Sequence, residues 1–414
     1  MKNVQCLLLA LVILGARASA QDITFLYMKQ SGYDLSDIVA RADSFQRETG
    51  TRARPIFVEY KDRYSLITAA AARAVPDYDL ILLDLIWTAD FAAHGIIDPL
   101  PPRLVRSVAA GIVPGIYGPF EYRGKLWALP FHVDFQLLYT NLDLLARAGN
   151  SRPPRTLEEL ERAAAEAKSR GVLRYPVFDS WNEQEVLVCE FTWLVGAFGG
   201  KLTGPGGRVS CTTPACVAAV RFMKRLLDEG LVNPYSLQAD EDFAAEVFQA
   251  GDSLFTTNWS FLIRLLGAAG PQSGFRWALS PIPVSQRLAG TGVTTSSVSG
   301  FEGLSVMARS AHKEEAWSFA AYLDSPEFQG AHLEFMPVWR EVWARPSTIA
   351  NDLFLGIKQQ QIAGLQYRPV HPLYGRISAA LQKWLFKALQ GQAPPEKALA
   401  EAQREIDAVV KEGP

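Results

Sequence analysis

The chain has 414 residues, with 41 Lys and Arg against 43 Asp and Glu, so its formal net charge is −2. This balance excludes a general nucleic-acid binder and a protein held at anionic membranes by charge. The length exceeds one ordinary hydrophobic core, so at least two lobes are expected. Aromatic residues make up 11% of the chain and include ten Trp, which suits a protein that handles flat, amphipathic ligands.

The N-terminus predicts an exported protein. Lys2 precedes an apolar run, Cys6–Gly15, and Ala18-Ser19-Ala20 forms a small-residue cleavage site. This pattern is typical of a signal peptide, residues 1–20, cut after Ala20. The alternative is a membrane anchor, but the run is shorter than the roughly 20 residues that span a bilayer. We therefore expect a periplasmic or secreted protein.

The first part of the mature chain alternates strands and helices. Apolar strands are expected at 23–27, 54–58 and 79–83, with helices at 33–49 and 64–74 between them. Such a βαβαβ order predicts an α/β lobe with helices on both faces of a largely parallel sheet.

The rest of the chain is richer in helices. A capping box at Thr156–Glu159 opens one helix, and Pro214 stands in the first turn of another. The expected helices are 156–170, 185–199, 213–230, 240–249, 259–267, 310–324, 374–390 and 395–411, with a loop at 283–300 and a strand at 304–307. No low-complexity linker separates the lobes, so we expect lobes that exchange strands, with the chain crossing between them several times.

Three cysteines remain after residue 20. Cys211 and Cys216 flank a helix entry, and the oxidising compartment favours a disulfide between them; two free thiols are the alternative. Cys189 lies in an apolar run and is expected to be a buried thiol. No His lies at ligand spacing near them, so no metal and no cofactor are expected.

Residues 121–141 carry the most informative pattern. A turn at Arg123–Lys125 leads into an apolar strand that ends at Pro130, and a second extended run covers Phe135–Tyr139. The polar break between them places Asp134 at a bend. This predicts two strands joined by a hinge with a carboxylate on it; an ordinary turn Asp is the alternative.

Several segments together resemble the extracellular solute-binding proteins of carbohydrate ABC importers, the group that includes maltose- and trehalose-binding proteins. The matching segments are 76–87, 91–100, 122–130, 198–200, 248–251, 258–259 and 368–374. The resemblance implies two strand-exchanged α/β lobes of the periplasmic-binding-protein fold, 21–131 plus 300–337 and 132–299 plus 338–414. Crossings are implied near 131–134, 299–301 and 336–339. The implied function is to bind a sugar, such as trehalose, maltose or a short oligosaccharide, in the interlobe cleft. The implied partner is a membrane permease, and the protein is expected to be a monomer.

Sugar chemistry predicts the kind of site independently. Charged planar groups pair with adjacent hydroxyls, and the less polar sugar face stacks on aromatic rings. Asp84 follows a buried strand and is a candidate acceptor, because ligands lie beyond the carboxyl ends of such strands; capping the next helix is its alternative role. Asp134 is the second candidate carboxylate, and Trp259, beside Asn258, is the candidate stacking ring or a core Trp.

Further candidates come from the resemblance. Gly300 lets the backbone approach a ligand, and Phe301 lies at a position where the family carries an aromatic residue against the sugar. Arg368 matches a position that reaches into the cleft, or is a surface Arg. The remaining candidates are Gln30, Glu183 and Trp339, with Glu190 and Glu302 as possible additional carboxylates.

Two other functions fit less well. An exported glycoside hydrolase would need an acid–base pair, for which Asp84 and Asp134 are the pair to test, but no catalytic motif surrounds them. A binding protein for another solute, such as a polyamine, would surround the cations with acidic groups. Binding without catalysis is the preferred hypothesis.

Overall fold

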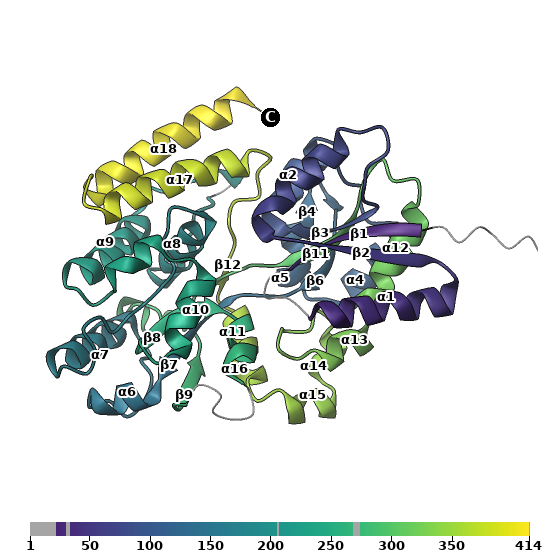
Figure 1. The fold of residues 1–414 in the computed structure, drawn as a ribbon. Helices are drawn as coiled ribbons and strands as arrows, with labels where there is room; N and C mark the ends of the chain where they lie inside the picture. Colours follow the sequence, from purple (N-terminus) through teal and green to yellow (C-terminus); the bar gives the residue numbers. More distant parts are fainter. Residues whose placement is uncertain (1–21, 30–33, 205–206, 268–273, 414) are drawn as a thin grey trace, which may run out of the picture.

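The computed structural model describes residues 22–29, 34–204, 207–267 and 274–413. Its elements gather into two α/β lobes (Figure 1), one formed mainly by the N-terminal part of the chain and the other by its middle and C-terminal parts. The predicted signal peptide and Gln30 lie outside the described residues.

The first lobe is built on a five-stranded sheet with the order β2-β1-β3-β11-β6. Its strands are β1 (Asp22–Met28), β2 (Arg52–Val58), β3 (Leu80–Asp84), β6 (Leu129–His132) and β11 (Glu302–Val306). The main helices of this lobe are α1 (Leu35–Thr49), α2 (Tyr60–Ala71), α3 (Thr88–Ala93), α4 (Pro102–Gly111), α5 (Pro114–Tyr117), α12 (Lys313–Leu323) and α13 (Pro326–Ala331). A small hairpin, β4 (Glu121–Tyr122) and β5 (Lys125–Leu126), completes it.

The direction of the strands gathers polar side chains at one edge of this sheet. β1 runs parallel to β2 and β3, whereas β11 is antiparallel to β3 and β6. Glu302 therefore begins its strand opposite Asp84 and His132, which end theirs. This is the carboxyl edge, where open α/β sheets bind ligands.

The second lobe has an antiparallel sheet of three strands with the order β8-β7-β9, and it is rich in helices. The strands are β7 (Gln136–Asn141), β8 (Phe255–Trp259) and β9 (Trp277–Ser280). The helices are α6 (Leu142–Arg147), α7 (Leu157–Ser169), α8 (Glu185–Ala197), α9 (Pro214–Asp228), α10 (Glu241–Gln249), α11 (Phe261–Leu266), α16 (Leu355–Ile362), α17 (Tyr374–Leu389) and α18 (Pro395–Glu412).

Local sequence signals account for several of these boundaries. The Thr156 hydroxyl caps α7 by accepting from Glu159 N at 3.1 Å, as the capping box predicted. Thr213 caps α9, whose first residue is Pro214. α1 ends at Gly50, whose φ of 80° lies in the left-handed region that glycine tolerates.

The chain crosses between the lobes at two of the predicted places. Val133 and Phe135, between β6 and β7, form isolated bridges with Met336 and Ser299. The second crossing runs from β10 (Ser297–Val298), which pairs with β12 (Leu365–Gln366), into β11.

The prediction for the third crossing was wrong. Trp339 bridges to Ile112 and Arg340 donates to the Ala110 carbonyl, so the chain remains against α4 through α14 (Arg340–Trp343). It meets the second lobe at α16, where Gln361 accepts from Ile282 N. The segment after residue 338, assigned to the second lobe, thus begins against the first.

The boundary of one predicted helix also needs correction. The helix expected at 259–267 begins at Phe261, because Trp259 still pairs with Gln136 in the sheet. Seven shorter helices had not been predicted, namely α4, α5, α6, α13, α14, α15 (Pro346–Asn351) and α16. In the part of the chain described here, no helix is long and apolar enough to cross a membrane.

The predicted disulfide between Cys211 and Cys216 is absent, and both residues are buried free thiols. Their sulfur atoms face different partners: Cys211 Sγ lies 3.5 Å from the Leu399 carbonyl, and Cys216 Sγ accepts from the Thr213 hydroxyl at 3.1 Å. Burial raises the pKa of the Cys211 thiol to about 12. Cys189 is buried and free, as expected.

Candidate functional site

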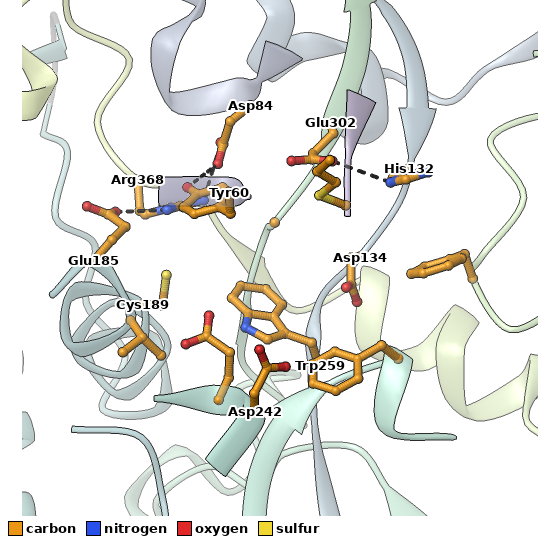
Figure 2. A pocket seen from close by; sticks show the side chains of 16 residues that line it. Tyr60, Asp84, His132, Asp134, Glu185, Cys189, Asp242, Trp259, Glu302 and Arg368 are labelled. Atoms are coloured by element: carbon orange, nitrogen blue, oxygen red, sulfur yellow. Dashed lines mark hydrogen bonds and ion pairs between the residues drawn. The ribbon is translucent and has the colours of Figure 1, made fainter. Parts of the chain in front are cut away.

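A cavity of about 130 Å³ lies where the carboxyl edge of the first sheet faces the second lobe (Figure 2). Its lining combines six carboxylates, one guanidinium and several rings. The lining residues are Met28, Tyr60, Asp84, His132, Asp134, Glu185, Val186, Cys189, Glu241, Asp242, Trp259, Phe261, Gly300, Glu302, Phe335 and Arg368.

Asp84 lines the cavity and also caps the turn that follows its strand. It ends β3, and its Oδ1 accepts from Ile86 N at 3.1 Å, which caps the short 3-10 turn Leu85–Trp87. Its Oδ2 accepts from the Tyr60 hydroxyl at 2.7 Å. Burial raises the pKa of Asp84 above its ordinary value, although the Arg368 guanidinium opposes this shift. Asp84 thus lines the cavity while it fixes the turn.

Glu302 and His132 form the next part of the same edge. The carboxylate of Glu302 is paired with the fully buried guanidinium of Arg63 and lies 3.4 Å from His132 Nδ1. Burial alone would raise the pKa of Glu302, but Arg63 and His132 hold it below its ordinary value. Burial lowers the pKa of His132, whose Nε2 lies 3.0 Å from the Tyr27 hydroxyl.

Arg368 joins the two lobes electrostatically. Its Nη1 donates to Glu185 on α8 at 2.8 Å, and its Nη2 lies 3.9 Å from Asp84 on β3. Nη2 also donates to the Ser299 carbonyl at the second crossing. Only 3% of the side chain is exposed, so this is a buried interlobe ion pair rather than a surface one.

Asp134 anchors the first crossing. Its Oδ1 accepts from Phe135 N at 2.8 Å, from Ser260 N at 2.9 Å and from the Ser260 hydroxyl at 2.7 Å. Its carbonyl accepts from Gly300 N, which ties the first crossing to the second. Burial raises the pKa of Asp134 to about 6, against those hydrogen bonds.

Trp259 presents its ring to the cavity from the end of β8 (Figure 2). The Tyr139 hydroxyl donates to its carbonyl at 2.9 Å and fixes the backbone. A Cβ at Gly300 would lie 2.5 Å from Cζ3 of the indole, so only glycine allows this ring position. Glu241 and Asp242, in the first turn of α10, lie beside the ring.

The structure brings together five of the nine predicted ligand-binding residues, namely Asp84, Asp134, Trp259, Gly300 and Arg368.

Three others do not line the cavity. Phe301 is fully buried in the core. Glu183 is exposed in a turn before α8. Trp339 packs against Gly111 and donates its indole N–H to the Asp324 carbonyl at 2.7 Å, so it lines a separate cavity in the first lobe. Gln30 lies outside the described residues.

Several lining residues were missed by sequence reasoning. Glu185 lies two positions after the predicted Glu183. Because acidic residues favour the first helical turn, the predicted beginning of α8 could have indicated Glu185. The same signal applies to Glu241 and Asp242. Tyr60 and His132 reach the cavity only through tertiary packing, for which the sequence carries no local signal. Glu190, considered as a ligand contact, is buried away from the cavity and accepts from Gln136 and Trp193.

An interlobe cavity at crossing strands, lined by carboxylates, a guanidinium and an indole, defines a two-lobe binding protein. Residues 28–330 match the model of the family described as bacterial extracellular solute-binding protein. A probable ABC transporter-binding protein of Deinococcus radiodurans is 25% identical over 417 residues, covering 96% of each chain. A maltotriose-binding protein of Pyrococcus abyssi is 22% identical and covers 79% of this chain and 70% of its own. The solved structure of a maltose-bound MalE3 of T. maritima superposes with a TM-score of 0.85, at 23% identity, over 94% of this chain and all of that one.

The chain belongs to the bacterial extracellular solute-binding protein family. The predicted fold is confirmed, and so is the prediction of binding without catalysis, because this family is non-enzymatic. The glycoside-hydrolase alternative is therefore not supported.

Proposed function

We propose that the protein is the sugar-binding component of an ABC importer, and that it closes its two lobes on a carbohydrate and delivers it to the membrane permease. One observation carries this proposal: a single cavity unites Trp259, Asp84, Asp134 and Arg368 from both lobes and both crossings. An indole face suits the less polar face of a pyranose. Carboxylates and a guanidinium suit its vicinal hydroxyls.

The relatives support the same class of solute, since maltose and maltotriose are named for two of them. The cavity is smaller than the roughly 300–1,000 Å³ typical of small-molecule sites. A mono- or disaccharide, such as maltose or trehalose, therefore fits the proposal better than a long oligosaccharide. Export through cleavage after Ala20 and a monomeric state belong to the same proposal.

A thermal shift screen across mono-, di- and oligosaccharides tests it. A ligand at 100 times its dissociation constant should stabilise the protein by about 2.7 kcal/mol. The screen should include spermidine. A thermal shift with this polyamine and with no sugar would indicate that the ligand is a cationic solute rather than a carbohydrate. The absence of a shift with every sugar would contradict the proposal.

A further inference from the structure

The lining of the cavity has a strong imbalance of charge. Six carboxylates face it, but Arg368 is the one Arg or Lys among the lining residues that the structure describes. A second guanidinium, that of Arg63, lies behind Glu302. A neutral sugar can satisfy hydrogen bonds, but it cannot offset net negative charge in a desolvated space.

The two guanidinium groups balance the negative charge of the three carboxylates in the upper part of Figure 2, namely Asp84, Glu185 and Glu302. Arg63 pairs with Glu302, and Arg368 is shared by Asp84 and Glu185. Glu185 also accepts from the hydroxyls of Tyr374 and Ser378.

Asp134 and Glu241, two carboxylates near Trp259, are not balanced in the same way. Neither Asp134 nor Glu241 forms an ion pair with a described Lys, Arg or His. Burial raises the pKa of Glu241 to about 7, with further contributions from Asp242 and Asp240, although the Trp259 indole opposes the shift. The N-terminus of α10 favours acidic residues by its dipole. The buried ammonium of Lys358 is paired with Asp352 and acts on Asp134 from beyond ion-pair distance, so among the described residues Asp134 and Glu241 have no cation in direct contact.

An organic cation fits this arrangement better than a metal ion. Among the residues described, no group of three or more His, Cys, Asp or Glu is placed to hold a metal. An ammonium group brings three donors for carboxylate oxygens. It also gains energy over the face of an indole, the best aromatic partner for a cation.

We propose that the natural ligand is an amino sugar whose protonated amine lies among Asp134, Glu241 and the ring of Trp259. This inference rests on the proposed function and deepens it. The hydroxyls of the sugar then form hydrogen bonds with Asp84, Glu185 and Arg368, on the opposite side of the cavity.

Isothermal titration calorimetry with matched ligands tests the inference. Glucosamine, N-acetylglucosamine and glucose form one set; the corresponding β-1,4-linked disaccharides form a second. At pH 7.5 the amine-bearing member of at least one set should bind at least tenfold more tightly than both neutral members, and this preference should shrink as NaCl is raised. Glu241→Gln should reduce the preference by about tenfold, whereas Glu246→Gln, an exposed change on the same helix, should leave it intact.

The outcomes separate the two proposals. Neutral and charged members that bind equally in both sets would overturn the amino-sugar assignment and leave the sugar-binding function in place. Binding of spermidine with no binding of any sugar would overturn both. An unchanged preference in Glu241→Gln, with its melting temperature retained, would also refute the placement of the amine.

Discussion

The interlobe ion pair of Arg368 gives the sharpest prediction about stability. Arg368→Met keeps the length and apolar stem of the side chain but leaves Asp84 and Glu185 without their shared cation. Removing one partner of a buried pair costs roughly 3–5 kcal/mol. Since Glu185 is 22% exposed and keeps its hydrogen bonds to two hydroxyls, we expect the lower end, about 3 kcal/mol.

The control is a second Arg–Glu pair of the same chain. Arg376 pairs with Glu412 on the surface, with side chains 51% and 60% exposed. Arg376→Met should therefore cost under about 1 kcal/mol. Urea unfolding followed by circular dichroism measures both free energies. A loss for Arg368→Met that is no larger than that for Arg376→Met would refute the claim that this pair holds the lobes together.

Three further predictions concern the cavity and the thiols. Gly300→Ala should weaken sugar binding at least tenfold by displacing the Trp259 ring, whereas Gly118→Ala, whose Cβ meets nothing within 4 Å, should not; equal titration curves would contradict this. Folding raises the pKa of Asp134 to about 6 and that of Glu241 to about 7. A carboxyl with a raised pKa stabilises the fold at low pH and loses that contribution as pH rises through its folded value. The unfolding free energy of the ligand-free protein should therefore fall between about pH 4 and pH 7, from the unfolded to the folded pKa values, by at most about 3 kcal/mol for each group, and a rise would refute the assignment. Thiol titration of the denatured mature chain should count three free thiols without reductant; a count of one would restore the disulfide.

Much of the fold could be predicted because its signals are local. Buried apolar runs gave β1 and β3, and caps such as Thr156 and Thr213 gave the beginnings of α7 and α9. The third crossing could not be predicted, because the position of Trp339 depends on contacts with Ile112 and Asp324, both far away in sequence.

The residues of the candidate site likewise divide into those that the sequence could indicate and those that it could not. Asp84 and Asp134, which line the cavity, could be singled out because each follows a recognisable strand. Gly300 was suggested by the family resemblance, and the structure gives another reason for it, the closeness of the Trp259 ring. Phe301 was misplaced by one step of strand alternation: it turns into the core, whereas its neighbours Gly300 and Glu302 face the cavity. That alternation is fixed only by pairing with distant strands.

The central claim is that a carbohydrate lies on the ring of Trp259 between the two lobes. Its most direct test is the dissociation constant of the best sugar from the screen, measured for the wild type, for Trp259→Ala and for Trp384→Ala, which removes a partly buried indole on α17 away from the cavity. We predict at least a tenfold loss of affinity for Trp259→Ala and wild-type affinity for Trp384→Ala. Wild-type affinity in a folded Trp259→Ala variant would contradict the assignment of this cavity as the binding site.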